Sequence, residues 1–169
     1  AKLTSITGFK HYNHNDLFDL DGTDYNDGIQ NDHVDSNTLT QELQLASSND
    51  GPLQWVTGLY YLRDRAKQHV RVALASGAQL VDFSARLKTT AWAMFAQGTY
   101  SLADSLKLTL GGRYSYERKA VEVDDQLLLL NTLLIPLTNA QSARSWKSFT
   151  PKIGLDWQIS NKIMAYASA

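Results

Sequence analysis

The sequence contains no cysteine, which excludes disulfide bonds and thiolate metal sites. It also lacks any uninterrupted apolar run of roughly 18 residues, so we expect no transmembrane helix. Residues 1–7 lack the apolar core of a signal peptide. The 16 Lys and Arg residues nearly balance the 17 Asp and Glu residues, so the charge does not imply nucleic acid as a partner. The length of 169 residues suits one domain.

What the sequence does contain is a long alternation of residue types across 89–118. Its second half places one set of residues on one strand face: Leu106, Leu108, Leu110, Gly112, Tyr114 and Tyr116. The first half places a similar set on one face: Trp92, Met94, Ala96, Gly98 and Tyr100. A period of two indicates strands and not helices, so this stretch predicts a hairpin with one face wholly apolar or small.

The apolar face of this hairpin has the dimensions of a membrane-spanning strand. The eight steps from Trp92 to Tyr100 cover roughly 26 Å along a strand, or about 19 Å along the membrane normal at a tilt of about 45°. Aromatic residues stand at both ends of this span. Outer-membrane barrels show an apolar band of similar height between two aromatic girdles.

The remaining segments extend the pattern into an antiparallel, up-and-down transmembrane β-barrel segment. We expect strands at 3–13, 38–48, 53–64, 148–158 and 163–169, which gives six strands and a partial seventh with the hairpin. Connections alternate between long and short. The long ones would be extracellular loops, at 14–37, 65–88 and 119–147. The short ones would be periplasmic turns, at 49–52, 103–105 and 160–162.

The same pattern assigns side chains to the two faces of the wall. The expected aromatic girdle consists of Trp55, Trp92, Tyr100, Tyr114, Tyr116, Phe149 and Trp157. Charged residues on the opposite face would point into the lumen, and these are Lys107, Arg113, Lys152 and Asp156. They could contact a plug or a ligand, but a charge ladder between neighbouring strands is the simpler explanation and the one we favour. The even-numbered residues of the two hairpin strands can lie on the same side of the sheet only if the turn has an odd length or contains a bulge.

Three blocks of this sequence resemble TonB-dependent outer-membrane receptors, at 40–62, 91–119 and 148–168. The resemblance implies a large barrel closed by a plug domain. It also implies import of a scarce ligand, such as a ferric siderophore, cobalamin or an oligosaccharide, energised through the TonB complex. No plug and no energy-coupling box are found in residues 1–169, so we expect part of a receptor barrel. The implied partners are outer-membrane lipid, the receptor's own plug, the TonB complex and a small-molecule or metal-chelate ligand, in a Gram-negative outer membrane.

Other candidate sites have simpler explanations. Asp19, Asp21 and Asp24 could ligate a cation or a cationic ligand, but their spacing differs from an EF-hand and a solvated loop explains them as well. The four histidines lack metal-ligand spacing, so no metal site is expected. The apolar run 127–137 could line a ligand entrance or pack on other loops. We expect no catalytic residues and no cofactor.

Two other functions remain open at this stage. A passive structural or porin-like barrel would share the hairpins but need no plug. A soluble β-sandwich binding module would place Leu108, Leu110, Ile153 and Leu155 against a second sheet. In a membrane barrel those residues would face lipid, where a charge would cost about 2–4 kcal/mol near the midplane.

Overall fold

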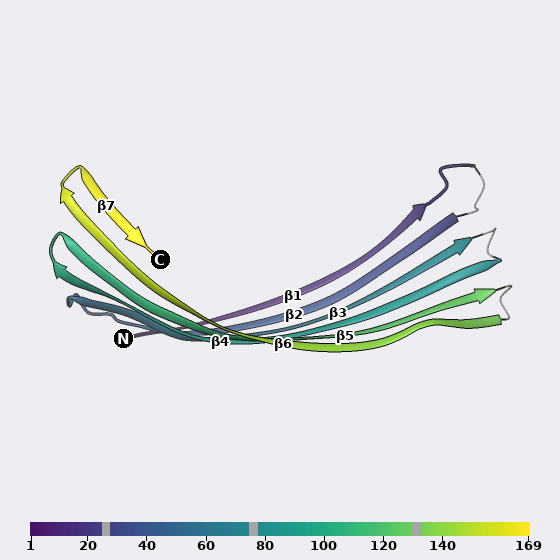
Figure 1. Ribbon diagram of the computed structural model, residues 1–169, viewed down its shortest axis with the longest axis horizontal. Coiled ribbons are helices and arrows are strands. Elements are labelled where there is room, and N and C mark those ends of the chain that lie inside the picture. The colour runs from purple at the N-terminus through teal and green to yellow at the C-terminus, as the bar shows by residue number, and fades with distance from the viewer. Residues whose placement is uncertain (25–27, 75–77, 130–132) are drawn as a thin grey trace.

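The structure is a single seven-stranded antiparallel sheet in which the strands follow one another in sequence order (Figure 1). It is a computed structural model that describes residues 1–24, 28–74, 78–129 and 133–169. The strands are β1 (Lys2–Asp19), β2 (Gly28–Ala46), β3 (Leu53–Leu74), β4 (Gln79–Ala103), β5 (Leu106–Leu129), β6 (Leu133–Ser160) and β7 (Ile163–Ser168). This is the all-β, up-and-down arrangement that the sequence predicts.

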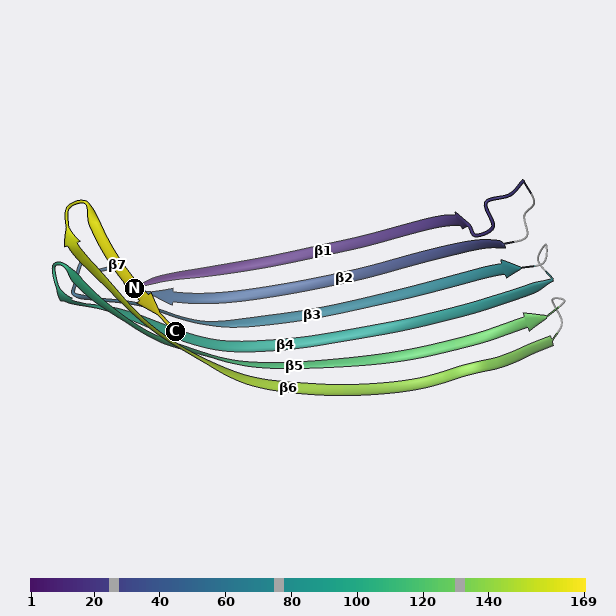
Figure 2. The same ribbon diagram turned by 45° about the horizontal axis from the view of Figure 1, so that its top comes forward.

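The sheet forms a curved trough with two distinct faces (Figure 2). In β4, the even-numbered side chains from 86 to 96 are exposed, whereas Thr89 and Ala93 on the opposite face are buried. Side chains spread apart on the outside of a curve and crowd together on its inside. We therefore call the face with Trp92 and Met94 the convex face, and the face with Thr89 and Ala93 the concave face.

The register carries each face across the sheet, because directly paired residues point to the same side. One convex row runs through Leu43, Leu59, Met94, Tyr114 and Phe149. The register shift between Ser101 and Ala103 leaves Tyr100 opposite Leu108. The predicted irregularity at this turn is therefore confirmed, and it keeps the apolar residues of β4 and β5 on one face.

The sheet has no hydrophobic core of its own. Among the described residues, Ala93 is the only buried hydrophobic one, and no large side chain is fully buried. Most large apolar residues are exposed, including Leu3, Leu59, Leu110 and Ile153. The backbone ladder holds the strands together, and whatever covers the two faces must supply the rest of the stability.

The prediction of long irregular loops was wrong over most of their lengths. Segments 14–37, 65–88 and 119–147 are instead continuations of β1 to β6, which pair out to connections at 20–27, 75–78 and 130–132. Residues 25–27, 75–77 and 130–132, including part of the apolar run 127–137, lie outside the described residues. The strands continue because hydrogen bonding between their backbones does not depend on side-chain polarity. The alternation of apolar residues that predicted the strands is lost outside the membrane-height segment, so the continuation was missed.

The three short turns lie together at the other end of the sheet, as predicted (Figure 1). They connect β2 to β3, β4 to β5 and β6 to β7. No helix among the described residues has the length and apolar character needed to span a membrane.

Gly58 is a position on the concave face where a side chain would not fit. A Cβ atom there would lie 2.6 Å from the Leu43 carbonyl oxygen and 2.6 Å from the ring of Phe95. Phe95 pairs directly with Gly58, so its ring occupies the space over the glycine. A Cβ at Gly154, on the same face, would meet Thr109 at an ordinary 3.6 Å.

We predict that Gly58→Ala destabilises the complete protein, because either the β2 backbone or the Phe95 ring must move. Overpacking of this kind costs about 1–3 kcal/mol. The measurement is urea unfolding of the complete protein, with Gly154→Ala as the matched control. Equal effects of the two substitutions would contradict the packing at Gly58.

Candidate functional site

The convex face carries an apolar band that crosses all six long strands near the turn end. Its exposed members include Leu59 (56%), Met94 (51%), Leu110 (53%) and Ile153 (52%). The aromatic residues assigned to a girdle all lie on this face, at Trp55, Trp92, Tyr100, Tyr114, Tyr116, Phe149 and Trp157. Trp92 contacts two of them, with ring centroids 5.6 Å from Tyr114 and 5.8 Å from Tyr116. An exposed, continuous apolar band of this size requires a nonpolar covering.

The concave face at the same height carries charged and polar side chains, with a few apolar ones such as Val56 and Phe95 among them. The charged residues assigned to the lumen all lie on it, with Lys107 opposite Asp156, Arg113 opposite Thr150 and Lys152 opposite Gly111. The Lys152 ammonium donates to Gln97 Oε1 at 3.0 Å. Arg113 Nε donates to Ser115 Oγ at 3.1 Å, and its guanidinium lies 5.7 Å from the ring centroid of Tyr60. Arg113 and Lys152 are bound only to neutral groups within the described sheet, so their charges are open to a further partner.

Hydrogen bonds link neighbouring strands across the concave face. Thr38 Oγ1 donates to Asp64 Oδ1 at 2.6 Å, and the Thr99 and Thr109 hydroxyls lie 2.9 Å apart. Within β5, Lys119 pairs with Glu117 at 3.2 Å. Such a wall is satisfied in contact with water or with polar protein.

Near the loop end, the concave face of β3 to β6 becomes largely apolar. We call this surface the vestibule patch, and it comprises Val70, Val72, Val81, Phe83, Val123, Leu127 and Ile135. Two of its rows run Val70–Phe83–Asp125 and Val72–Val81–Leu127–Ile135. Asp125 Oδ1 is buried within this surface without a hydrogen-bond partner among the described residues. The patch therefore combines apolar side chains with one unpaired carboxylate oxygen.

Our sequence interpretation missed the vestibule patch because its residues fell in segments assigned to loops. The signal was present. From 81 to 87 the odd positions are Val, Phe, Ala and Leu, while the even positions Asp82, Ser84 and Arg86 are polar. The same alternation occurs around Val121 and Val123. A barrel strand is usually apolar on its outer face and polar on its inner face. Here the apolar residues lie on the concave face, so this alternation is easily overlooked as a strand signal.

The acidic candidates Asp19, Asp21 and Asp24 lie where β1 ends and the following connection begins. Asp19 Oδ1 accepts from the backbone amides of Asp21 at 3.2 Å and Gly22 at 3.3 Å, and Gly22 has a φ of 64°. Asp21 Oδ1 accepts from the Thr23 amide at 2.8 Å. Asp19 and Asp21 thus hold a turn. Within the described part of the chain, no group of three or more His, Asp or Glu residues has a geometry that could hold a metal ion.

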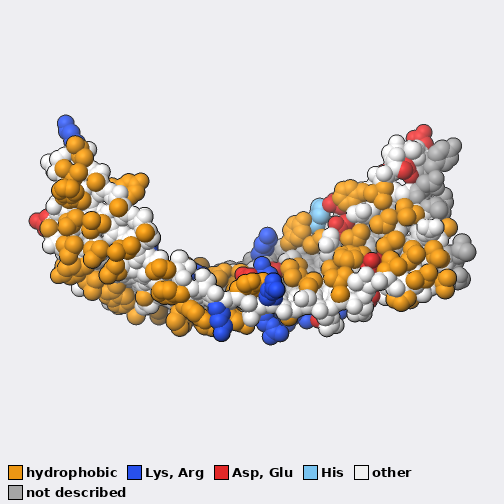
Figure 3. Space-filling view, in the orientation of Figure 1, with side chains coloured by type: hydrophobic (Ala, Val, Ile, Leu, Met, Phe, Trp, Pro, Cys, Tyr) orange, Lys and Arg blue, Asp and Glu red, His pale blue; other side chains and the backbone are white. Residues whose placement is uncertain are grey.

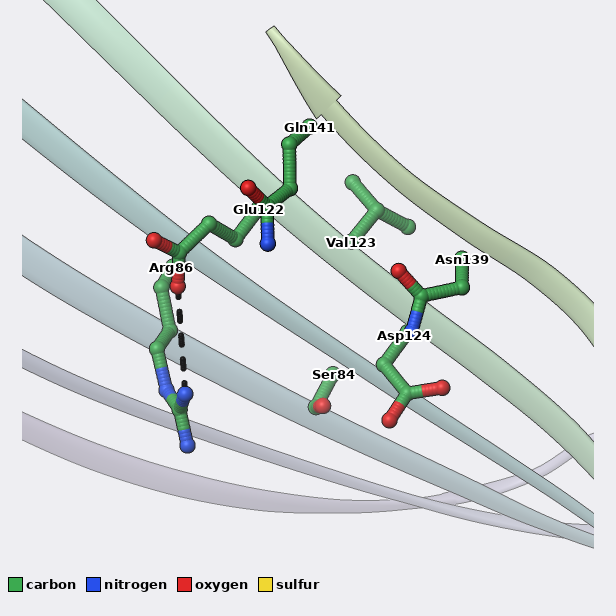
Figure 4. A pocket seen from close by; sticks show the side chains of 7 residues that line it. All are labelled: Ser84, Arg86, Glu122, Val123, Asp124, Asn139 and Gln141. Carbon is green, nitrogen blue, oxygen red and sulfur yellow. Dashed lines mark ion pairs between the residues drawn. The ribbon is translucent and has the colours of Figure 1, made fainter.

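On the convex face, the rows between the aromatic residues and the apolar outermost row Ala73–Leu80–Leu128–Leu134 are polar and charged. Figure 4 shows a shallow pocket there, in which Arg86 Nη1 lies 3.9 Å from Glu122 Oε2, with Asp124, Asn139 and Gln141 beside them. On the neighbouring strand β3, His69 Nε2 lies 2.6 Å from Asp82 Oδ1. Arg71 Nε donates to the other oxygen of Asp82 at 3.1 Å. These are exposed cross-strand pairs of the kind that stabilise a solvated sheet.

Comparison with known proteins agrees with this geometry. The family described as "TonB dependent receptor-like, beta-barrel" matches residues 2–169. The ferric yersiniabactin uptake receptor FyuA from Yersinia pestis superposes with a TM-score of 0.81 at 16% identity, over 98% of this chain and 24% of that one. The ferric citrate transporter FecA, in its unliganded form, gives 0.60 at 12% identity, with the same coverages. The chain thus spans about a quarter of these structures. No curated protein sequence matches.

We predict that Lys107→Cys combined with Asp156→Cys forms a disulfide in the complete protein, because the two residues are direct cross-strand partners. Paired residues lie about 4.5–5.5 Å apart at Cα, within disulfide range. The measurement is mass spectrometry before and after reduction. Arg113→Cys with Asp156→Cys is the control, since 113 lies roughly 20 Å along the strand from 107. Crosslinking of the control pair instead would contradict the register.

Proposed function

This chain belongs to the TonB-dependent receptor family as part of its β-barrel, and we propose that it forms a section of the wall of an outer-membrane active importer. The observation that carries the proposal is the contrast between faces at one height. The convex face is apolar across six strands, whereas the concave face presents Arg113, Lys152 and Asp156. A barrel wall between lipid and a polar interior needs this contrast, and a sandwich would need its apolar face covered by a second sheet.

The concave face gives the proposed wall its internal partner. Arg113 and Lys152 are bound to neutral groups, so a plug domain with carboxylates at this height would pair with them. We propose that the plug and the other strands come from the rest of the receptor, and that the plug receives energy from the TonB complex. The proposed activity is transport and not catalysis: the ligand is moved without any bond in it being made or broken.

The vestibule patch gives the proposed wall its ligand contact. It lies at the loop end, which in this orientation is the extracellular mouth. Its apolar rows through Phe83 and Val81 would contact the organic part of a ligand. The structures with similar folds carry ferric yersiniabactin and ferric citrate in their names. We therefore propose a ferric chelate with an apolar outer surface as the imported ligand.

The test of active import is uptake of radiolabelled ferric chelates by cells that depend on the complete receptor. We expect saturable uptake that disappears when the TonB gene is deleted. Uptake that persists unchanged without TonB would overturn the proposal and favour the passive, porin-like alternative.

We also predict that Arg113→Ala with Lys152→Ala loosens the plug, because both substitutions remove charges from the concave face. The expected result is increased sensitivity to a large hydrophilic antibiotic that a closed barrel excludes, together with reduced chelate uptake. The matched control is Arg86→Ala with Arg71→Ala, which removes two charges from the convex face near the loop end. If both double variants leave sensitivity unchanged, the concave charges do not hold the plug.

A further inference from the structure

The loop end of the concave face carries negative charge without positive charge. Going towards the loops, the last concave row with a Lys or Arg contains Lys10, Lys119 and Arg144. Beyond that row the described strands place no Lys or Arg on the concave face, and they place three carboxylates there, at Asp16, Asp32 and Asp125. In the view of Figure 3, the loop-end arm of the trough shows hydrophobic and acidic side chains, whereas Lys and Arg gather near its middle.

The three carboxylates lie in one row across the sheet, which we call the acidic row. It runs Asp16–Asp32–Val70–Phe83–Asp125, from β1 to β5. Val70 and Phe83 belong to the vestibule patch, so the acidic row and the patch form one continuous surface. Asp32 and Asp125 are three strand spacings apart, roughly 14 Å. A small organic ligand that rests on Val70 and Phe83 would therefore have a carboxylate on each side.

No Lys or Arg compensates these carboxylates within the described sheet. Asp16 contacts His14, and Gln68 Nε2 donates to both oxygens of Asp32 at 3.1 Å. Asp125 Oδ1 is buried and has no hydrogen-bond partner among the described residues. Asp16 and Asp32 are also direct cross-strand partners, and like charges in that position destabilise a sheet. A cationic group bound against this pair would relieve the repulsion.

The surroundings of the acidic row indicate what kind of cation it suits. Nowhere in the described chain are three His, Asp or Glu residues grouped so that they could hold a metal ion. The carboxylates are instead separated by apolar side chains, and the ring of Phe83 adds a surface that attracts organic cations. A cavity lined by charges of one sign also concentrates ligands of the opposite sign. This chemistry fits a ligand with an apolar body and a protonated amine.

We propose that the vestibule selects ferric chelates that carry a protonated amine. The apolar part of the chelate would contact the vestibule patch, and the ammonium group would bind between Asp16 and Asp32. This inference rests on the proposed function, because it takes the loop end as the ligand entrance, and it adds the sign of the ligand's charge. Chelates in which carboxylates hold the iron are anionic, and the acidic row would repel them.

The first test is equilibrium binding of two matched chelates to the complete receptor in a neutral detergent at neutral pH. One is a ferric trihydroxamate with a pendant ammonium group. The other is its N-acetylated form, which has the same iron centre and no charge. Because hydrogen bonds between charged groups are stronger than neutral ones, we expect the ammonium chelate to bind about 10-fold more tightly. Equal affinities, tighter binding of the acetylated form, or no binding of either chelate would overturn the proposal.

The second test assigns the preference to the acidic row. In the variant Asp16→Asn with Asp32→Asn, we expect the two chelates to bind equally, while the acetylated form keeps its wild-type affinity. The matched control is Asp82→Asn with Asp124→Asn. It removes the same charge from the convex face at the same height, because these residues are the chain neighbours of Phe83 and Asp125. A folded Asp16 and Asp32 variant that retains the full preference would contradict the proposal, and the wild-type comparison stands even if that variant does not fold.

Uptake by cells separates this inference from the proposed function. If the ammonium chelate binds more tightly but enters cells equally well without the TonB gene, active transport is refuted and the charge preference stands. If TonB-dependent uptake instead favours the acetylated chelate or an anionic one, the charge preference is refuted and active transport stands.

Discussion

The structure depends on a backbone ladder that has no hydrophobic core beneath it. Strands up to 28 residues long pair only with their neighbours, and a single buried hydrophobic residue, Ala93, is found in the described sheet. Such a layer cannot bury apolar surface against itself. Each face must therefore match the medium that covers it, and the exposed edges of β1 and β7 need further strands. The placement of side chains along each strand follows from this requirement.

The two faces change character at different heights. On the convex side, the apolar band around Leu110 and Ile153 ends at the row containing Trp92, beyond which Lys and Arg side chains appear. On the concave side, a polar wall around Arg113 gives way to the vestibule patch near the loop end. In a barrel wall, the outer face of a strand would pass from lipid through headgroups to water, and the inner face from the plug to the site where ligand enters. The two faces would then change character at different heights. The proposed importer wall follows from it.

The sequence predicted the part of the fold in which one face is apolar and the other polar. The hairpin around Trp92 and Leu110, its register shift and the position of the short turns were all visible as period-two alternation and turn residues. The continuation of the strands was not, because beyond the band both faces contain charges or the apolar face is reversed, as at Phe83. The turn after β1 was not predicted either. There Asp19 accepts hydrogen bonds from backbone amides, and this contact depends on the path of the chain and not on residue spacing.

The central claim is that the convex face of β5 contacts lipid and its concave face does not. The most direct measurement places spin labels, one at a time, at every position from 106 to 118 of the complete receptor in bilayers, in a background free of other cysteines. Even-numbered labels from 108 to 114 should be accessible to oxygen, which partitions into lipid, and the odd-numbered labels between them should not. An absence of this period-two pattern, or equal burial of both sets, would contradict a lipid-facing barrel wall.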